Sequence, residues 1–175
     1  TGSGKTQLYV SLINDIVAKG KQALFMLPEI ALTAQMIRRL KMYFGNNIAI
    51  YHSKFNPNER VEIWNKVKTG DIKIVLGARS ALFLPYKDLS LIVIDEEHDG
   101  SYKQQDPAPR YQARDTAIYY ANQLNAKVVL GSATPSVETF YNAKSDKFGY
   151  TYLSERFSQA SLPKIELIDT KKQPS

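Results

Sequence analysis

The feature that most constrains this chain is the stretch Leu91–His98, in which four apolar residues run directly into four polar ones. Leu91–Ile94, rich in Ile and Val, is typical of a strand that is buried on both faces of a sheet. The residues that follow are Asp95, Glu96, Glu97 and His98. Ligands of open parallel sheets bind beyond the carboxyl ends of the strands. The stretch therefore indicates either a catalytic sheet edge or a solvated acidic turn, and does not decide between them alone.

The order of strand, polar loop and helix recurs about five times in the 175 residues. We expect strands at 23–27, 48–51, 73–76, 91–94 and 127–130, and late strands at 150–153 and 165–168. Helices are expected to begin near residues 8, 36, 57, 113 and 137. This order predicts an α/β, three-layer domain with a mainly parallel sheet, in which the polar loops share one edge. The domain is expected to cover 1–168, with a polar tail at 169–175.

The apolar spacing also predicts which helix faces are buried. Leu8, Leu12, Ile13, Ile16 and Val17 form one stripe. A second stripe consists of Met36, Ile37, Leu40 and Phe44. The basic residues Arg38, Arg39 and Lys41 lie outside this stripe, and we interpret them as a solvated helix face rather than a nucleic-acid patch. Asn56, Pro57 and Glu59 predict a helix start, with Val61, Trp64 and Val67 facing inward.

Composition narrows the class of protein. The chain is 43% hydrophobic and 23% charged, and no apolar run approaches the ~18 residues that a membrane span requires. Cysteine is absent, which excludes disulfides and thiolate zinc sites within these residues and agrees with a reducing compartment. The formal net charge of +6 permits a polyanionic partner without requiring one.

Thr1–Thr6 has the Gly-Lys-Thr end of the phosphate-binding pattern G-x-x-x-x-G-K-[ST]. The chain begins inside this pattern, so we expect it to be a piece of a longer protein. In such a loop Gly2, Ser3 and Gly4 bring backbone N–H groups to phosphate oxygens at the start of a helix. Lys5 would reach the β- and γ-phosphates, and the Thr6 hydroxyl would ligate Mg²⁺.

The phosphate loop and the acidic strand end together predict nucleotide hydrolysis. Asp95 would hold Mg²⁺ opposite Thr6, and Glu96 would orient and deprotonate the attacking water. Lys5 would neutralise charge on the transferred phosphoryl group. The two motifs, some ninety residues apart, are more specific together than either is alone.

Further motifs resemble those of superfamily 2 helicases, in the same order along the chain. They are Pro28–Thr33, Gly77–Phe83, Asp95–His98 and Gly131–Ser136. More narrowly, the sequence from Val93 through Gln105, with Arg110-Tyr111 and Ala113-Arg114-Asp115, resembles the PriA family of replication-restart DNA helicases. The likeness extends from Thr1 to about Glu138 and implies the first RecA-like, P-loop NTPase lobe of an ATP-dependent motor.

This resemblance also implies roles for individual residues. His98 would couple the nucleotide site to its neighbours, and Ser132, Ala133 and Thr134 would link hydrolysis to DNA movement. The loop 102–111 would sense single-stranded DNA through Tyr102, Lys103, Arg110 and Tyr111, although Asp106–Pro109 lacks an aromatic that some relatives carry. Arg79 and Ser80 would lie near the DNA backbone, where Arg79 would pair with a phosphate.

Some of these residues have a purely structural interpretation as well. Tyr102 and Tyr111 would otherwise cover a core edge, and Arg79 would cap a helix or pair with a carboxylate. His52 is interpreted as structural, and His98 is not expected to bind a metal, because no second His or Cys is nearby in sequence.

The resemblance implies ATP and Mg²⁺ as cofactors, and zinc only in the full-length protein. It further implies a cytoplasmic protein that acts on single-stranded and forked DNA with primosome proteins and single-strand-binding protein, and no membrane. A second lobe would complete the ATP site, so the isolated chain is expected to hydrolyse ATP poorly. The rival functions are a RecG-like translocase of superfamily 2, a nucleotide-gated scaffold without motor action, and a basic surface that only binds DNA.

Overall fold

A five-stranded parallel sheet forms the centre of the molecule, in a computed structural model that describes residues 4–52 and 56–153. The strand order is β2-β3-β1-β4-β5, and every pairing between neighbours is parallel. The strands are β1 (Gln22–Met26), β2 (Ile48–Tyr51), β3 (Ile74–Gly77), β4 (Leu89–Asp95) and β5 (Lys127–Gly131). The five strands of the repeating pattern are thus confirmed, each to within about two residues at its ends.

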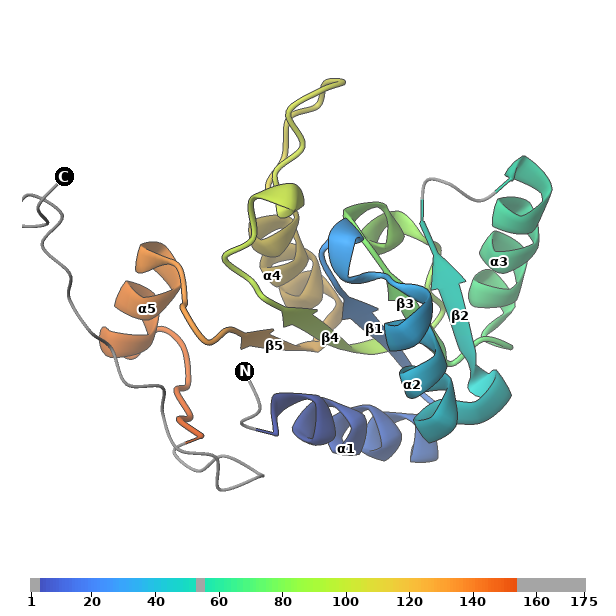
Figure 1. Cartoon of the computed structure of the whole chain (residues 1–175), viewed down its shortest axis with the longest axis horizontal. Helices are drawn as coiled ribbons and strands as arrows, with labels where there is room; N and C mark the ends of the chain where they lie inside the picture. Colours follow the sequence, from blue (N-terminus) through green and yellow to red (C-terminus); the bar gives the residue numbers. More distant parts are fainter. Residues whose placement is uncertain (1–3, 53–55, 154–175) are drawn as a thin grey trace, which may run out of the picture.

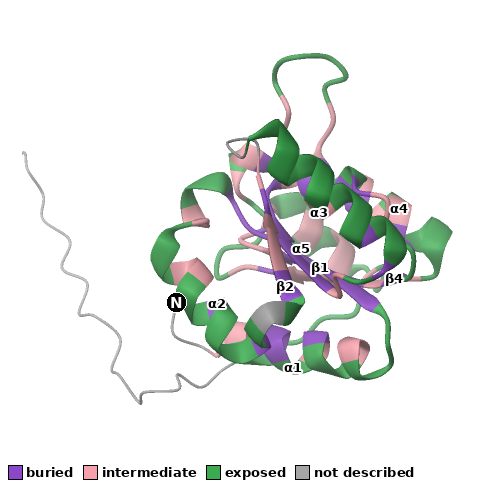
Figure 2. Cartoon of the chain, turned by 90° about the vertical axis from the view of Figure 1, so that its right-hand side faces the viewer, coloured by how far each residue is buried: buried purple, intermediate pink, exposed green. Residues whose placement is uncertain are grey.

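Helices cover both faces of this sheet and give the predicted three layers (Figure 1). α1 (Lys5–Ala18) and α2 (Ala34–Phe44) pack on one face, against a core that contains Ala23 and Phe25 of β1. α3 (Pro57–Thr69) and α4 (Ala113–Leu124) pack on the other, against Leu24 and Met26. Alternate residues of β1 therefore face opposite cores, and the whole strand is buried (Figure 2). This burial explains its continuous apolar sequence.

Short helical turns and one further helix complete the described chain. The 3₁₀ turns are η1 (Glu29–Ala31), η2 (Gly45–Asn47), η3 (Arg79–Phe83) and η4 (Gly100–Tyr102), and the last helix is α5 (Val137–Lys144). η1 follows the carboxyl end of β1, and η3 follows the carboxyl end of β3. In the same way, η4 comes directly after the turn that ends β4. The polar connections thus gather at one edge of the sheet, as predicted.

The predicted start of α3 is confirmed in detail. The Asn56 side chain accepts a hydrogen bond from the Glu59 N–H at 2.9 Å, and the Glu59 carboxylate accepts one from the Asn56 N–H at 3.3 Å. Pro57 occupies the first turn, where it has no backbone bond to lose. Gly70 ends the helix with a φ of 82°, a left-handed conformation that glycine adopts without strain.

Two predicted buried faces of helices are confirmed only in part. In α1, Ile13 is buried and Leu12, Ile16 and Val17 pack against the core as predicted. Leu8, however, is 41% exposed, whereas its neighbour Tyr9 is 2% exposed. In α3, Val67 is buried as predicted, but Val61 and Trp64 are 59% and 44% exposed. The spacing alone does not distinguish a core stripe from an adjacent exposed one.

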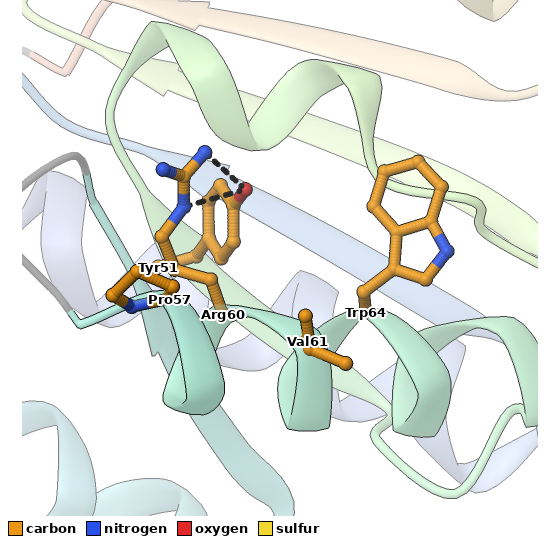
Figure 3. Close-up of a pocket in the computed structure, with 5 residues that line it drawn as sticks. All are labelled: Tyr51, Pro57, Arg60, Val61 and Trp64. Carbon is orange, nitrogen blue, oxygen red and sulfur yellow. Dashed lines mark hydrogen bonds between the residues drawn. The ribbon is translucent and has the colours of Figure 1, made fainter.

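The exposed side chains of α3 line a shallow hollow of about 290 Å³, shown in Figure 3. Arg60 lies over the Tyr51 ring at 5.7 Å and donates hydrogen bonds to the Tyr51 hydroxyl. Trp64 lies on the other side of the hollow from this pair (Figure 3). The only tryptophan of the chain therefore borders a surface hollow instead of filling the core.

The end of the chain differs from the prediction as far as the structure describes it. Residues 150–153 have no regular secondary structure, so the strand predicted there is wrong. The predicted strand at 165–168, the domain boundary at 168 and the tail at 169–175 lie outside the described residues. Within 4–52 and 56–153, none of the helices has the length and apolar character needed to cross a membrane.

Candidate active site

The start of α1 lies against the end of β4, which brings the two predicted motifs together. The Lys5 ammonium is 2.8 Å from Oε1 of Glu96 and 3.6 Å from Oδ1 of Asp95, across 91 residues of sequence to Glu96. Gly4 precedes the helix with a φ of 81°, a left-handed conformation. Thr6 is half-buried in the first turn, next to Lys5. Gly2 and Ser3 of the predicted phosphate loop lie outside the described residues.

Asp95 is held from two sides by buried tyrosines. The Tyr9 hydroxyl donates to Oδ1 of Asp95 at 3.1 Å, and the Tyr102 hydroxyl donates to the Asp95 main-chain carbonyl at 2.8 Å. Burial raises the pKa of the Asp95 carboxyl, while the nearby Lys5 charge opposes that rise. Burial, with the neighbouring carboxylates, raises the pKa values of both tyrosines, so both hydroxyls remain protonated donors.

Glu96 has the backbone strain that is typical of functional positions. Its φ is 49°, in the left-handed region that few residues other than glycine occupy. The Asp99 N–H donates to the Glu96 carbonyl at 2.8 Å, and the Glu97 N–H donates to the Gly131 carbonyl at 3.1 Å, which fix the turn. Such strained residues persist where surrounding contacts hold them, and they cluster at active sites.

Glu97 is a buried carboxylate with four hydrogen-bond donors around it. Its carboxylate, in a residue only 1% exposed, accepts hydrogen bonds from Arg114, from the Thr139 hydroxyl, and from both the N–H and hydroxyl of Ser136, at 2.7–3.1 Å. Burial would raise the pKa of this carboxyl, but these donors outweigh burial and lower the pKa. The turn after β4 is thereby joined to the start of both α4 and α5.

His98 connects the acidic turn to the loop after β5. Its Nδ1 lies 2.7 Å from the Ser132 hydroxyl and its Nε2 lies 3.5 Å from the Thr134 hydroxyl. The Ser132 hydroxyl in turn accepts a hydrogen bond from the Thr134 N–H at 3.0 Å. The structure therefore brings His98 together with Ser132 and Thr134, two of the three residues predicted to link hydrolysis to DNA movement. Ala133 is exposed beside them.

Arg79 contacts main chain, not a carboxylate. Its Nη1 donates to the carbonyls of Ser101 at 3.1 Å and Lys103 at 3.4 Å. Ser101 lies in η4 and Lys103 is the C-cap of that turn, so the guanidinium ties η3 to the end of η4. This agrees with the alternative that Arg79 caps a helical turn and not with the alternative that it pairs with a carboxylate. Ser80 is half-buried next to it.

The loop 103–112 projects from the sheet edge as an exposed hairpin-like segment (Figure 1). Lys103 and Gln112 pair at its base, and the Gln104 side chain donates to the carbonyls of Pro107 and Pro109 inside it. Arg110 is exposed, and Tyr111 packs edge-to-face against Phe83 at 5.1 Å. The loop is therefore internally organised and open to solvent.

The position of Tyr102 does not fit the DNA contact that was predicted for it. It is 1% exposed, and its hydroxyl is bonded to the Asp95 carbonyl, so its ring is not available to a base. The alternative that it covers the core edge is confirmed. Tyr111, by contrast, is only partly buried.

The residues at this site suit a magnesium ion that is bound together with a nucleotide. Within the described ranges, no group of three or more His, Cys, Asp or Glu side chains is arranged to hold a metal. Asp95 is a single carboxylate of 14% side-chain exposure at the open sheet edge. Mg²⁺ is commonly bound by one or two protein oxygens together with substrate phosphates. The residues present fit that mode, and Thr6 and Asp95 are the ones that would hold the ion.

Several supporting residues were not predicted from the sequence. Tyr9, Arg114, Ser136 and Thr139 all contact the acidic turn, yet none received a role from its own sequence position. The sequence did contain an indication of a role for Tyr9, because this tyrosine is adjacent to the apolar stripe and comes shortly after the phosphate loop. Buried tyrosine hydroxyls usually have a hydrogen-bond partner.

Comparison with known proteins agrees with this geometry. The chain is similar to the replication restart proteins PriA of Chlamydia trachomatis (46% identity over 169 residues, 97% of this chain and 22% of the relative) and Rickettsia felis (49% over 173 residues, 99% and 26%). The PriA protein of Bacillus subtilis is 41% identical over 99% of this chain and 21% of its own length. The chain thus spans about a fifth to a quarter of the curated relatives it matches.

Solved structures show the same fold. RecG bound to a three-way DNA junction matches 81% of this chain and 18% of its own, with a TM-score of 0.57 and 25% identity. The C-terminal domain of the DEAD-box protein Dbp5 matches 83% of this chain and 79% of its own, with a TM-score of 0.54 and 16% identity, which shows the fold alone. The model of the DEAD/DEAH box helicase family matches residues 1–142. The chain therefore belongs to the DEAD/DEAH box helicase family.

Proposed function

We propose that this chain is the first RecA-like lobe of an ATP-dependent DNA helicase that acts in replication restart. The observation that carries the proposal is the contact of Lys5 with Glu96 and Asp95. It places the lysine of a phosphate loop against a carboxylate pair at the end of a buried strand. The similarity to PriA proteins, at 41–49% identity over nearly the whole chain, supports the restart role over the RecG-like alternative at 25%.

In this proposal each residue near the sheet edge has a role. Gly2, Ser3, Gly4 and Lys5 bind the phosphates, and Lys5 exchanges its carboxylate partners for phosphate oxygens when ATP binds. Thr6 and Asp95 hold Mg²⁺, which supplies charge neutralisation at the phosphates.

Glu96 is the general base. It orients the attacking water and accepts its proton, and its left-handed backbone conformation is of the strained kind that clusters at active sites. His98, Ser132 and Thr134 link this turn to the loop after β5, through which hydrolysis is coupled to DNA movement.

DNA is proposed to cross the same edge of the molecule. Lys103, Arg110 and Tyr111 of the exposed loop, with Ser80 and Arg79, are the proposed contacts. Because Arg79 already bonds the carbonyls of Ser101, just before that loop, and of Lys103 at its base, its proposed role is to position the loop as well as to approach a phosphate. Single-stranded and forked DNA are the proposed substrates.

The remaining proposals concern the complete protein. Primosome proteins and single-strand-binding protein are its proposed partners, and the cytoplasm is its proposed location. This chain has no cysteine, so zinc is proposed to be bound by other parts of the protein.

The test is the ATPase rate of the complete protein with and without single-stranded DNA, repeated for Glu96→Gln. We expect DNA to stimulate the parent protein, and the variant to bind ATP and DNA while turnover falls by about 10²-fold or more. Hydrolysis that DNA leaves unchanged would favour a nucleotide-gated scaffold. Salt-dependent DNA binding that is indifferent to nucleotide would favour a surface without motor action. Strand displacement on forks with varied arms would separate PriA-like from RecG-like activity.

A further inference from the structure

Tyr9 contacts the candidate active site from inside the core. The ring is 2% exposed and packs edge-to-face on Phe25 of β1 at 5.5 Å. Its hydroxyl reaches out of this apolar layer and donates to Oδ1 of Asp95 at 3.1 Å. A buried hydroxyl that is bonded to a carboxylate forms a charge-assisted hydrogen bond, which is stronger than a neutral one.

The sheet is shaped to admit this hydroxyl. Gly131 is the residue of β5 that pairs with Asp95 of β4, so it lies beside Asp95 on the neighbouring strand. A Cβ atom at Gly131 would lie 2.7 Å from Cζ of Tyr9 and would overlap the hydroxyl. The absence of a side chain at Gly131 therefore makes room for the Tyr9–Asp95 hydrogen bond. The φ of Gly131 is not positive, so its backbone conformation does not by itself require glycine.

We propose that Tyr9 is a positioning residue: its hydroxyl fixes the rotation of the Asp95 carboxylate so that the carboxylate can hold magnesium. Gly131, which has no side chain, leaves room for this hydroxyl. This role rests on the proposed function. Residues outside the direct ligand set orient metal ligands, and their loss commonly weakens metal binding. Tyr9 does so from α1, the helix that also carries Lys5 and Thr6, so one rigid element positions the phosphate-binding residues and the carboxylate together.

The test uses the complete protein and follows the binding of methylanthraniloyl-ATP by fluorescence as Mg²⁺ is titrated. Tyr9→Phe keeps the ring and its packing but removes the hydroxyl. We expect the Mg²⁺ concentration for half-maximal nucleotide binding to rise about 3- to 10-fold, the equivalent of one hydrogen bond. Nucleotide affinity measured in EDTA should remain within twofold of the parent, because the phosphate loop is unaltered.

Gly131→Ala is the second variant, and it displaces the intact Tyr9 ring. It should shift the Mg²⁺ titration in the same direction, even if Tyr9→Phe folds poorly. Tyr86→Phe is the matched control, since the Tyr86 hydroxyl donates to the Ala81 carbonyl at 2.9 Å, at a position away from Asp95. It should leave the Mg²⁺ titration unchanged.

An unchanged Mg²⁺ titration in both Tyr9→Phe and Gly131→Ala would overturn the role of Tyr9, as would an equal shift in Tyr86→Phe. A parent protein that shows no Mg²⁺-dependent nucleotide binding would overturn the proposed function itself and this role with it. The two failures are distinguishable, because only the second affects the parent protein.

Discussion

The buried carboxylate Glu97 allows a sharp test, because Arg114 bonds two carboxylates in very different surroundings. Nη1 of Arg114 is 3.1 Å from Glu97, whose side chain is 1% exposed, and its Nε is 2.8 Å from Asp115, whose side chain is 60% exposed. Glu97→Gln keeps the shape of the side chain but leaves the buried guanidinium facing an amide. Breaking a buried pair by removing one partner costs about 3–5 kcal/mol. Asp115→Asn should cost less than about 1 kcal/mol, because water screens the exposed pair.

The assay is urea unfolding of the chain, followed by circular dichroism. Glu97→Gln is expected to lower the free energy of unfolding by several times as much as Asp115→Asn. Combining Glu97→Gln with Arg114→Met should be less destabilising than the sum of the two single changes, because the double variant leaves no unpaired buried charge. Equal effects of Glu97→Gln and Asp115→Asn would refute the reasoning, and strict additivity would show that the buried pair does not act as a unit.

Three further predictions concern other parts of the fold. Gln22→Leu should lower the free energy of unfolding by about 2–4 kcal/mol, since this buried amide bonds four main-chain groups at 2.8–3.0 Å; a loss below 0.5 kcal/mol in urea unfolding would contradict this. Gly77→Ala should reduce the thermal midpoint by an amount equivalent to about 1–3 kcal/mol, because its Cβ would lie 2.6 Å from the Tyr51 carbonyl oxygen; an unchanged midpoint would show that the strand end relaxes freely. Arg79→Ala should speed amide hydrogen exchange in residues 103–112 while the exchange of β1 stays unchanged; equal protection of the loop in both proteins would show that the two carbonyl contacts do not hold it.

The strands were predictable because their signal is local. Each is a short apolar run that ends at glycine, proline or a polar residue, and the recurring order of strand, polar loop and helix favours parallel pairing. The start of α3 was equally local, since Asn56, Pro57 and Glu59 are close neighbours in sequence. The meeting of Lys5 with Asp95 and Glu96 followed from topology, because both motifs adjoin the carboxyl edge of one sheet.

The orientation of side chains was less predictable. Trp64 fits an apolar spacing with Val67, yet it borders a surface hollow, because α3 packs on the sheet through another face. Tyr102 belongs to an exposed-looking polar loop, but its ring turns back beneath Asp95. In both cases the outcome depends on which neighbouring element supplies the opposite wall, and a local pattern does not contain that information.

The partners of Glu97 were hidden for the same reason. They come from α4 and from the start of α5, up to 42 residues away. The sequence shows three adjacent carboxylates and gives no indication that the third is buried among four donors, while the first two face Lys5. Only the packing of α4 and α5 against the end of β4 separates their roles.

The most direct test of the central claim is an experimental structure of the complete protein with Mg²⁺ and a non-hydrolysable ATP analogue. We predict one magnesium ion bound by the Thr6 hydroxyl and the analogue's phosphates, held by Asp95 directly or through water, with Lys5 on a phosphate oxygen and Glu96 facing the γ-phosphate. A nucleotide bound elsewhere, or a magnesium ion that neither Thr6 nor Asp95 approaches, would contradict the proposed site.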